Sequence, residues 1–273
     1  MHILEKIVYH KKEEVKNRKD LFPKALLEKS IFFNTDTVSM KKYLNRTDRT
    51  GVIAEFKRKS PSKGVINGFA DVEKVSIGYM QAGASALSVL TDEHYFGGKN
   101  EDLRLARKFN YCPVLRKDFI IDEYQILEAR SIGADAILLI AECLSKTEVK
   151  QFAKLAKELK MEVLFEIHSM EQLDKLNEYI DLVGVNNRDL TDFKVDINTS
   201  LELGRAIPNE FTKISESGIS DAEKVILLKE EGYRGFLIGE HFMKSSNPPK
   251  RCLEFIREIE NLQHQKVTQT IKL

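Results

Sequence analysis

The stretch ARSIGADAILLI (residues 129–140) combines the end of a helix, a glycine and an apolar run that is typical of a buried strand. Gly133 stands where a helix C-terminus favours the left-handed conformation, which glycine adopts without steric cost. The run that follows does not alternate between polar and apolar residues, so we expect both faces of the strand to be buried, as in a parallel sheet. The stretch therefore predicts a helix that leads directly into a parallel strand.

The same arrangement occurs in MQAGASALSVL (80–90) and LKEEGYRGFLIG (228–239), which place Gly83 and Gly232 at the corresponding position. Helical periodicity is found between most of the apolar runs, for example at 71–83, 122–133 and 145–160. Alternating strands and helices predict βαβ units. The predicted strands lie at 52–56, 85–90, 112–115, 135–141, 161–166, 181–186, 211–215 and 235–239.

These units predict an α/β protein with a (β/α)₈ fold, the TIM barrel, because their combined length is typical of that fold. A doubly wound open sheet is the alternative, but it would more often carry a glycine-rich fingerprint after its first strand, and KRKSPSKG (57–64) is not one. We find no linker and expect a single domain. It comprises a helical N-terminal extension (1–50), the barrel (51–260) and a polar C-terminal tail (261–273) that we expect to fray.

Composition restricts the class of protein. Hydrophobic residues make up 42% and charged residues 31% of the 273 residues, and the formal net charge is +1, which favours neither a nucleic-acid nor a membrane-surface partner. No apolar run is long enough to span a membrane, and the N-terminus lacks the features of a signal peptide. Cys112, Cys143 and Cys252 show no metal-ligand spacing. We therefore predict a cytoplasmic protein without a metal site.

Charged side chains stand at or just after the C-terminal ends of several predicted strands, where the active site of a (β/α)₈ barrel lies. Glu55 and Lys57 end the first strand and share one face, because side chains alternate along a strand. Lys117, Glu166 and Glu216 follow at the third, fifth and seventh strands. Inward residues of one layer come from alternate strands. We therefore expect one charged layer at the barrel mouth, although each residue alone would more often be solvated or salt-bridged.

Other residues near strand ends have two interpretations. Asn186, at the end of the sixth strand, fits a turn as well as a site, and Arg188 fits a loop cap. We interpret His168 as a loop residue rather than a base. Cys112 and Cys143 are expected to pack in or beside their apolar strands.

Two loops at the same end favour phosphate binding, because the loops after strands seven and eight of such barrels often bind phosphate through backbone N–H groups and a helix N-terminus. They read SESGISDAEK (215–224) and LIGEHFMKS (237–245). Gly218 and Gly239 permit close approach of the backbone, and Ser220-Asp221 is typical of a helix N-cap. The loops predict a phosphorylated small-molecule ligand.

In order and spacing, the motifs resemble those of the indole-3-glycerol phosphate synthase family of tryptophan biosynthesis. The resemblance covers nearly the whole chain, including the helical extension. It implies a lyase that closes the ring of 1-(2-carboxyphenylamino)-1-deoxyribulose 5-phosphate and releases carbon dioxide and water, without a cofactor or a metal. The motifs are EFKRKSPSKG (55–64), LTDEHYFGG (90–98), PVLRKDFI (113–120), FEIH (165–168), GVNNRDL (184–190), SESGIS (215–220) and FLIGE (236–240).

The resemblance also implies residue roles. Lys117 matches the general acid that assists the ring-closing attack on the carbonyl, and Glu166 matches the general base. Lys57, with Glu55 beside it, matches a lysine that contacts the substrate and takes part in proton transfer. Ring closure onto a ketone requires a proton at the developing oxyanion, which an ammonium can both stabilise and supply.

Further positions follow from the same match. Phe96 and Phe119 match apolar residues that pack on the anthranilate ring, although Phe119 fits ordinary core equally well. Some relatives have serine where Glu240 stands; a backbone N–H contact survives that change, whereas a side-chain hydroxyl contact does not. The remaining site positions are Asn186 and Glu216, and the substrate and phosphate contacts are Lys57, Ser60, Ser217, Gly218, Gly239 and Glu240, with Arg188 nearby.

Three alternatives are weaker. Phosphoribosylanthranilate isomerase uses a cysteine base on its first strand, and this chain has none there. The tryptophan synthase α subunit lacks the EFKRKSPS segment. A non-catalytic phosphate-ligand sensor would have no use for five acid and base residues. For the assembly we expect a monomer or a weak homodimer.

Overall fold

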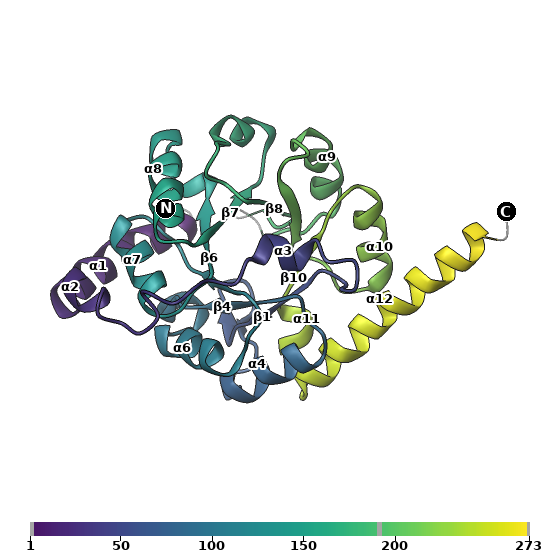
Figure 1. Cartoon of the computed structure of the whole chain (residues 1–273), viewed down its shortest axis with the longest axis horizontal. Helices are drawn as coiled ribbons and strands as arrows, with labels where there is room; N and C mark the ends of the chain where they lie inside the picture. The colour runs from purple at the N-terminus through teal and green to yellow at the C-terminus, as the bar shows by residue number, and fades with distance from the viewer. Residues whose placement is uncertain (1–2, 190–192, 272–273) are drawn as a thin grey trace.

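The computed structural model describes residues 3–189 and 193–271, and a closed barrel of parallel strands lies at its centre (Figure 1). Each barrel strand pairs with its neighbours along the chain, and the last pairs with the first. The predicted (β/α)₈ barrel is confirmed, and the open sheet is excluded. The strands are β1 (Val52–Phe56), β4 (Ala86–Leu90), β5 (Val114–Lys117), β6 (Ala136–Ile140), β7 (Glu162–Ile167), β8 (Leu182–Asn186), β9 (Thr212–Glu216) and β10 (Gly235–Ile238).

The barrel strands agree with the predicted runs to within one residue at each end, apart from β5, which is shifted by two. Residues 112–115 were expected, whereas β5 spans Val114–Lys117. Pro113 has no N–H to donate to a strand ladder, although its carbonyl accepts a hydrogen bond from Leu87 N at 2.9 Å. As a result the strand begins at Val114, and Lys117 belongs to the strand itself.

Helices surround the barrel and connect its strands (Figure 1). Gly83, Gly133 and Gly232 have φ angles of +98°, +92° and +87°, so the predicted left-handed helix ends are confirmed. Between β7 and β8 the connection is a 3₁₀ helix, η2 (Met170–Lys175). The other helices are α4 (Val72–Gln81), α5 (Glu93–Phe96), α6 (Asn100–Phe109), α7 (Glu123–Ser131), η1 (Ala141–Cys143), α8 (Lys146–Glu158), α9 (Asn198–Ala206), α10 (Ala222–Glu230), α11 (Glu240–Met243) and α12 (Pro248–Ile271).

Apolar side chains form two layers, one between the sheet and the helices and one inside the barrel. Ala54 and Phe56 pack outward against the helices, whereas Ile53 packs inside. Glu55 therefore shares the inner face with Ile53, because successive side chains point to opposite faces. The interior is filled by residues such as Ala86, Leu115, Leu138, Leu164, Leu182 and Ile214.

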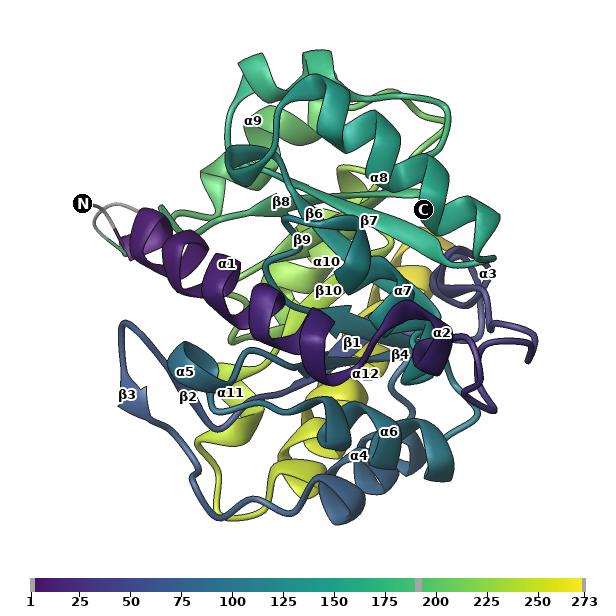
Figure 2. The same ribbon diagram turned by 90° about the vertical axis from the view of Figure 1, so that its left-hand side faces the viewer.

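The N-terminal extension consists of α1 (Ile3–Leu21), α2 (Lys24–Leu27) and α3 (Met40–Leu44). Pro23 precedes α2 as its N-cap, which accounts for the interruption expected in this region. Figure 2 shows α1 lying across one side of the barrel. Met40 and Leu44 of α3 belong to the inner core, so α3 covers the end of the barrel opposite to the strand C-termini.

The prediction of a frayed C-terminal tail is wrong. Helix α12 continues through Ile271 and extends away from the barrel (Figure 1). Glutamine and lysine are good helix formers, so a polar sequence does not end a helix whose first turns are anchored by buried Phe255 and Ile259. Residues 272–273 lie outside the described part of the chain. None of the described helices is both long and apolar enough to cross a membrane.

Candidate active site

A cavity of about 500 Å³ opens where the barrel strands end. All the predicted site residues line it, so the structure brings together side chains from nearly the whole length of the chain. Their individual chemical roles remain predictions. The residues are Glu55, Lys57, Ser60, Phe96, Lys117, Phe119, Glu166, Asn186, Arg188, Glu216, Ser217, Gly218, Gly239 and Glu240.

Lys117 lies between two carboxylates at the inner end of this cavity. Its Nζ is 2.8 Å from Glu166 Oε2 and 2.9 Å from Glu216 Oε2. The three residues stand on β5, β7 and β9, which are alternate strands of the barrel, so the predicted charged layer is confirmed. The Lys117 side chain is 13% exposed, against 3% and 2% for its partners, so the ammonium is the most accessible of the three groups.

Burial and charge have opposing effects on the pKa values in this layer. Burial disfavours the charged form of Lys117, but Glu166, Glu216 and Glu55 outweigh it and raise the lysine pKa. Burial also opposes ionisation of Glu166, but Lys117 and His168 hold its pKa below the ordinary value. For Glu216, burial and the neighbouring charge of Glu166 outweigh the attraction of Lys117 and raise the pKa to about 8. Near neutral pH the layer thus holds an ammonium, a carboxylate and a protonated carboxyl.

The second oxygen of Glu166 is also held in place. Asn186 Nδ2 donates to Glu166 Oε1 at 3.2 Å, and the Asn186 Oδ1 accepts from Arg188 N at 3.0 Å, which fixes the orientation of the amide. His168 Nε2 lies 3.6 Å from the same Glu166 oxygen. Among the described residues, His168 is not part of the cavity lining, which agrees with its interpretation as a loop residue.

Glu55 and Lys57 form an ion pair at the end of β1. The Nζ of Lys57 is 2.7 Å from Glu55 Oε1, and both residues line the cavity, so their predicted common face is confirmed. Gly239 makes room for this pair, because a Cβ atom there would lie 2.2 Å from Glu55 Oε1. The absence of a side chain at position 239 thus serves the acid on β1 as well as any ligand at the loop.

The loop after β9 has an unusual backbone. Ser217 and Gly218 have φ angles of +67° and +75°, and the left-handed conformation at a serine is costly unless neighbours impose it. Buried Asn187 holds the loop, since its Nδ2 donates to the Ser217 carbonyl and to Ser215 Oγ at 3.0 Å each. Asp221 Oδ1 then accepts from Lys224 N at 3.0 Å, so the predicted N-cap of α10 is confirmed.

Arg188 and Glu240 face each other beside this loop. Arg188 Nη2 lies 3.6 Å from Glu240 Oε2, and Arg188 Nη1 donates to the Phe193 carbonyl at 3.1 Å. Arg188 thus braces a loop, as one interpretation predicted, and still lines the cavity. The carboxylate of Glu240 partly offsets the guanidinium charge, so backbone groups remain important for binding an anion here.

The other end of the cavity is apolar. The rings of Phe96 and Phe119 lie 5.9 Å apart between centroids, with an interplanar angle of 36°. Leu4 and Ile7 of α1 also line the cavity, and sequence reasoning did not place them there. Their spacing of three residues, which puts both on one helix face, was the available signal.

A small antiparallel sheet after β1 was not predicted either. It pairs β2 (Lys59–Ser60) with β3 (Gly64–Val65) and holds Ser60 at the edge of the cavity. Arg58 anchors this sheet to α6, because its Nη2 donates to Asp102 Oδ1 at 2.9 Å. The turn between β2 and β3 is formed by Pro61, Ser62 and Lys63, residue types of which proline and serine are common in turns.

The cysteines are free. Cys112 is buried and the partly buried Cys143 packs against the core, as expected for both, and Cys252 is also buried. Burial raises the pKa of Cys112 to about 11, which makes it a poor nucleophile. Across residues 3–189 and 193–271, no group of three His, Cys, Asp or Glu side chains is placed to hold a metal ion.

Comparison with known proteins agrees with the geometry of the cavity. The family model described as indole-3-glycerol phosphate synthase matches residues 4–255. The chain is 46% identical over 258 residues to an indole-3-glycerol phosphate synthase from Bacteroides thetaiotaomicron, covering 94% of this chain and 99% of that protein. It is 42% identical over 259 residues to one from Caldanaerobacter subterraneus subsp. tengcongensis, covering 94% and 98%.

Solved structures with a similar fold include a mutant tryptophan synthase α subunit from Pyrococcus furiosus. Its TM-score is 0.59 at 16% sequence identity, and the match covers 78% of this chain and 98% of that one. At this identity the likeness shows the barrel fold alone.

Proposed function

Because this chain belongs to the indole-3-glycerol phosphate synthase family, we propose a specific division of labour among the residues of its cavity. The activity is that of the family, the formation of indole-3-glycerol phosphate in tryptophan biosynthesis. The observation that carries the assignment of roles is Lys117, whose ammonium lies between Glu166 and Glu216 and reaches the cavity.

The substrate has a phosphate at one end and an aryl ring at the other, which suits the polarity of the cavity. The phosphate lies against the loops after β9 and β10, where Ser217, Gly218 and Gly239 present backbone, with Arg188 beside them. The aryl ring packs against the apolar surface that the rings of Phe96 and Phe119 form together. In this orientation the ketone carbon of the substrate lies between the two ends, near Lys117.

Lys117 acts as the general acid in ring closure. The aromatic carbon that carries the carboxylate forms a bond to the ketone carbon, and the carbonyl electrons move onto oxygen, which takes the Lys117 proton. Loss of carbon dioxide returns an electron pair to the ring and restores its aromaticity. The positive charge of Lys117 is maintained chiefly by the carboxylate of Glu166, so the ammonium stabilises the developing oxyanion before the proton moves.

Glu166 acts as the general base in the dehydration that follows. It removes a proton from the CH₂ group beside the new hydroxyl, while the hydroxyl leaves as water with a proton from Lys57. Glu166 is available for this role because its lowered pKa keeps it ionised and therefore able to accept a proton, and Asn186 fixes its second oxygen. Glu55 keeps Lys57 charged and oriented through their ion pair.

A fluorescence assay with 1-(2-carboxyphenylamino)-1-deoxyribulose 5-phosphate tests the activity. The chain has no tryptophan, so the indole signal of the product stands out against the protein. We expect the signal to appear with turnover. A folded protein that gives no product would contradict the function and favour a ligand-binding role.

We further propose a cytoplasmic protein that acts as a monomer or a weak homodimer on a small phosphorylated substrate. Free cysteines support a reducing compartment. Sedimentation at micromolar concentration tests the assembly, and a stable tetramer would contradict it.

A further inference from the structure

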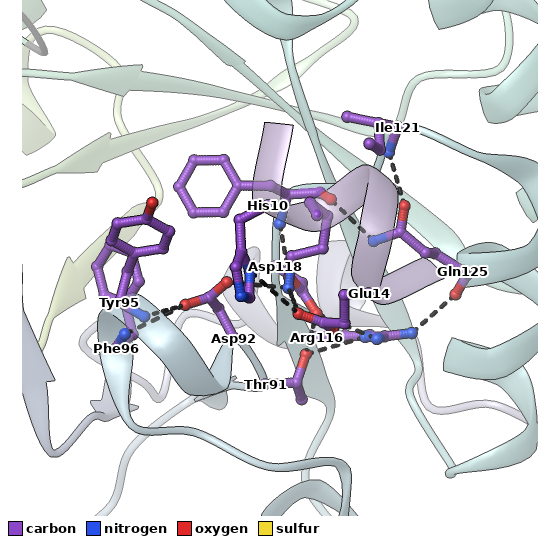
Figure 3. A network of polar contacts seen from close by, with 12 residues as sticks. His10, Glu14, Thr91, Asp92, Tyr95, Phe96, Arg116, Asp118, Ile121 and Gln125 are labelled. Atoms are coloured by element: carbon purple, nitrogen blue, oxygen red, sulfur yellow. Dashed lines mark hydrogen bonds and ion pairs between the residues drawn. The ribbon is translucent and has the colours of Figure 1, made fainter. Parts of the chain in front are cut away.

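Lys11 of α1 is completely buried and is surrounded by three carboxylates. Its Nζ lies 2.9 Å from Glu14 Oε2, 2.9 Å from Asp92 Oδ2 and 3.0 Å from Asp118 Oδ1. Figure 3 shows the side chains of Glu14, Asp92 and Asp118 close to one another. Burying a lysine is costly unless partners compensate, so the placement of this cluster requires an explanation.

Both aspartates also hold the backbone of the loops that line the apolar end of the cavity. Asp92 Oδ1 accepts from Tyr95 N at 2.7 Å and Phe96 N at 3.2 Å, leaving Oδ2 for Lys11. Asp118 Oδ1 accepts from Phe119 N at 2.8 Å. A single ammonium therefore connects the backbone supports of Phe96 and Phe119, which lie in the segments after β4 and β5, respectively.

Lys11 and Asp118 stay charged near neutral pH, whereas burial outweighs the attraction of Lys11 and raises the pKa of Glu14. Burial opposes the charge on Lys11, but Asp118, Asp92 and Glu14 outweigh it and raise the lysine pKa. Burial also opposes ionisation of Asp118, but Lys11 and Arg116 lower its pKa to about 2. The pair of Lys11 and Asp118 therefore acts as an ionic link between α1 and the loop after β5.

The same link orients α1. Leu4, Ile7 and Lys11 are spaced by three and four residues, so they lie along one face of the helix. Leu4 and Ile7 line the cavity. His10 adds a second contact with the loop after β4, because its ring stacks on that of His94 at 4.4 Å between centroids.

We propose that Lys11 is a positioning residue for the aryl-binding end of the cavity. By holding Asp92 and Asp118 together it sets the spacing of Phe96 and Phe119 and places α1 over them. Lys11 does not touch the substrate in this account. The proposal rests on the proposed placement of the aryl ring, and it adds a residue of the N-terminal extension to the determinants of substrate binding.

The test is the double variant Lys11→Met/Asp92→Asn, which removes one charge of each sign and keeps a side-chain oxygen for the helix cap. We expect the KM for the substrate to rise at least about tenfold while kcat falls less than about threefold, because aryl binding is lost and Lys117 keeps its partners. Competitive inhibition by inorganic phosphate reports on the opposite end of the cavity. Its inhibition constant should stay within about twofold.

An unchanged KM in the folded variant overturns the proposal. A parallel rise of the KM and of the phosphate inhibition constant overturns it as well, because it indicates that both ends of the cavity are disturbed. If the double variant does not fold, Asp92→Asn alone is measured. It leaves Lys11 with two carboxylates, and we expect at least about a threefold rise in KM. No rise in this variant overturns the proposal as well.

Two further variants separate this inference from the proposed placement of the substrate. Lys19→Met is the matched control, because Lys19 also joins α1 to the barrel, through an exposed ion pair with Asp122 at 2.7 Å. Its kinetic constants should equal those of the parent. Phe119→Ala tests the aryl site itself: an unchanged KM there refutes the placement of the ring. A raised KM in Phe119→Ala with an unchanged KM in the double variant refutes the role of Lys11 alone.

Discussion

At the scale of single residues, three ionisable groups in contact have different protonation states because of their surroundings. Lys117 is 2.8 Å from Glu166 and 2.9 Å from Glu216, and the two carboxyl groups are buried more deeply than the lysine. One ammonium between two carboxylates stabilises the ionisation of one of them more than the other. Glu166, with Asn186 on its second oxygen, is the one that stays ionised and can act as a base.

The raised pKa of Glu216 predicts a pH-dependent stability. Its folded pKa is about 8 against an ordinary value of 4.5, so the folded state binds more protons between these values, and stability falls as pH rises through this range. Glu216→Gln mimics the protonated form and removes this loss. In urea unfolding from pH 5 to pH 9, we expect the parent to lose about 1–3 kcal/mol relative to the variant. If the free energies of unfolding of the parent and of Glu216→Gln changed in parallel between pH 5 and pH 9, Glu216 would be ionised over this whole range and the prediction would be wrong.

At the scale of elements, the loops after β9 and β10 restrict their glycines in different ways. The loop after β9 has a left-handed backbone, whereas the loop after β10 lies against a side chain of β1. Gly218 has a φ of +75°, and a Cβ atom there would lie 2.3 Å from Val195 Cγ1. Gly239 is limited instead by Glu55. Sequence reasoning treated the two glycines as equivalent, because it could not show which side chain from a distant strand approaches each of them.

This difference predicts different kinetic effects of alanine at the two positions. Gly218→Ala should disturb the phosphate loop and raise KM at least about tenfold, with kcat changed less than about threefold. Gly239→Ala should displace Glu55 and therefore lower kcat as well. Steady-state kinetics give both constants. Gly83→Ala is the control for left-handed backbone strain, because Gly83 has a φ of +98° and the nearest atom to an added Cβ would be 3.6 Å away. This variant should lower the free energy of unfolding and leave both kinetic constants unchanged. An unchanged KM in both loop variants would place the phosphate elsewhere.

At the scale of the whole molecule, local repetition explains how much the sequence could predict. In stretches such as 129–140, a helix end, a glycine and a strand follow one another directly in the sequence. The barrel and its strand ends could therefore be predicted from this local pattern. The charged layer followed, because strand ends of a closed barrel meet at one mouth. The roles within the layer came from the resemblance to a family rather than from the pattern.

Features that depend on distant pairs could not be predicted. Lys11 and Asp118 are far apart in the sequence, and a lysine on a polar helix indicates a solvated position unless its partners are known. Asn187 was missed for the same reason, since its partners lie on β9 and α9. The helical course of the tail was missed because polarity was taken as evidence of disorder, although it only indicates exposure.

The absence of a metal requirement is a prediction for the molecule as a whole. Proton transfer by Lys117, Glu166 and Lys57 accounts for each step without a Lewis acid. Activity should therefore persist after exhaustive chelation with EDTA and dialysis, measured in the fluorescence assay. Loss of turnover that a divalent ion restores would contradict the mechanism.

The most direct test of the central claim is the kinetics of Lys117→Met, which preserves side-chain length and removes the charge. An acid that acts mainly in the transition state should affect kcat rather than KM. We predict that kcat falls at least about 10²-fold, as is typical for the loss of general acid catalysis, while KM changes little. Lys57→Met should alter both constants, and circular dichroism confirms that each variant is folded. A folded Lys117→Met enzyme with kcat within about tenfold of the parent would contradict the account and transfer the acid role to Lys57.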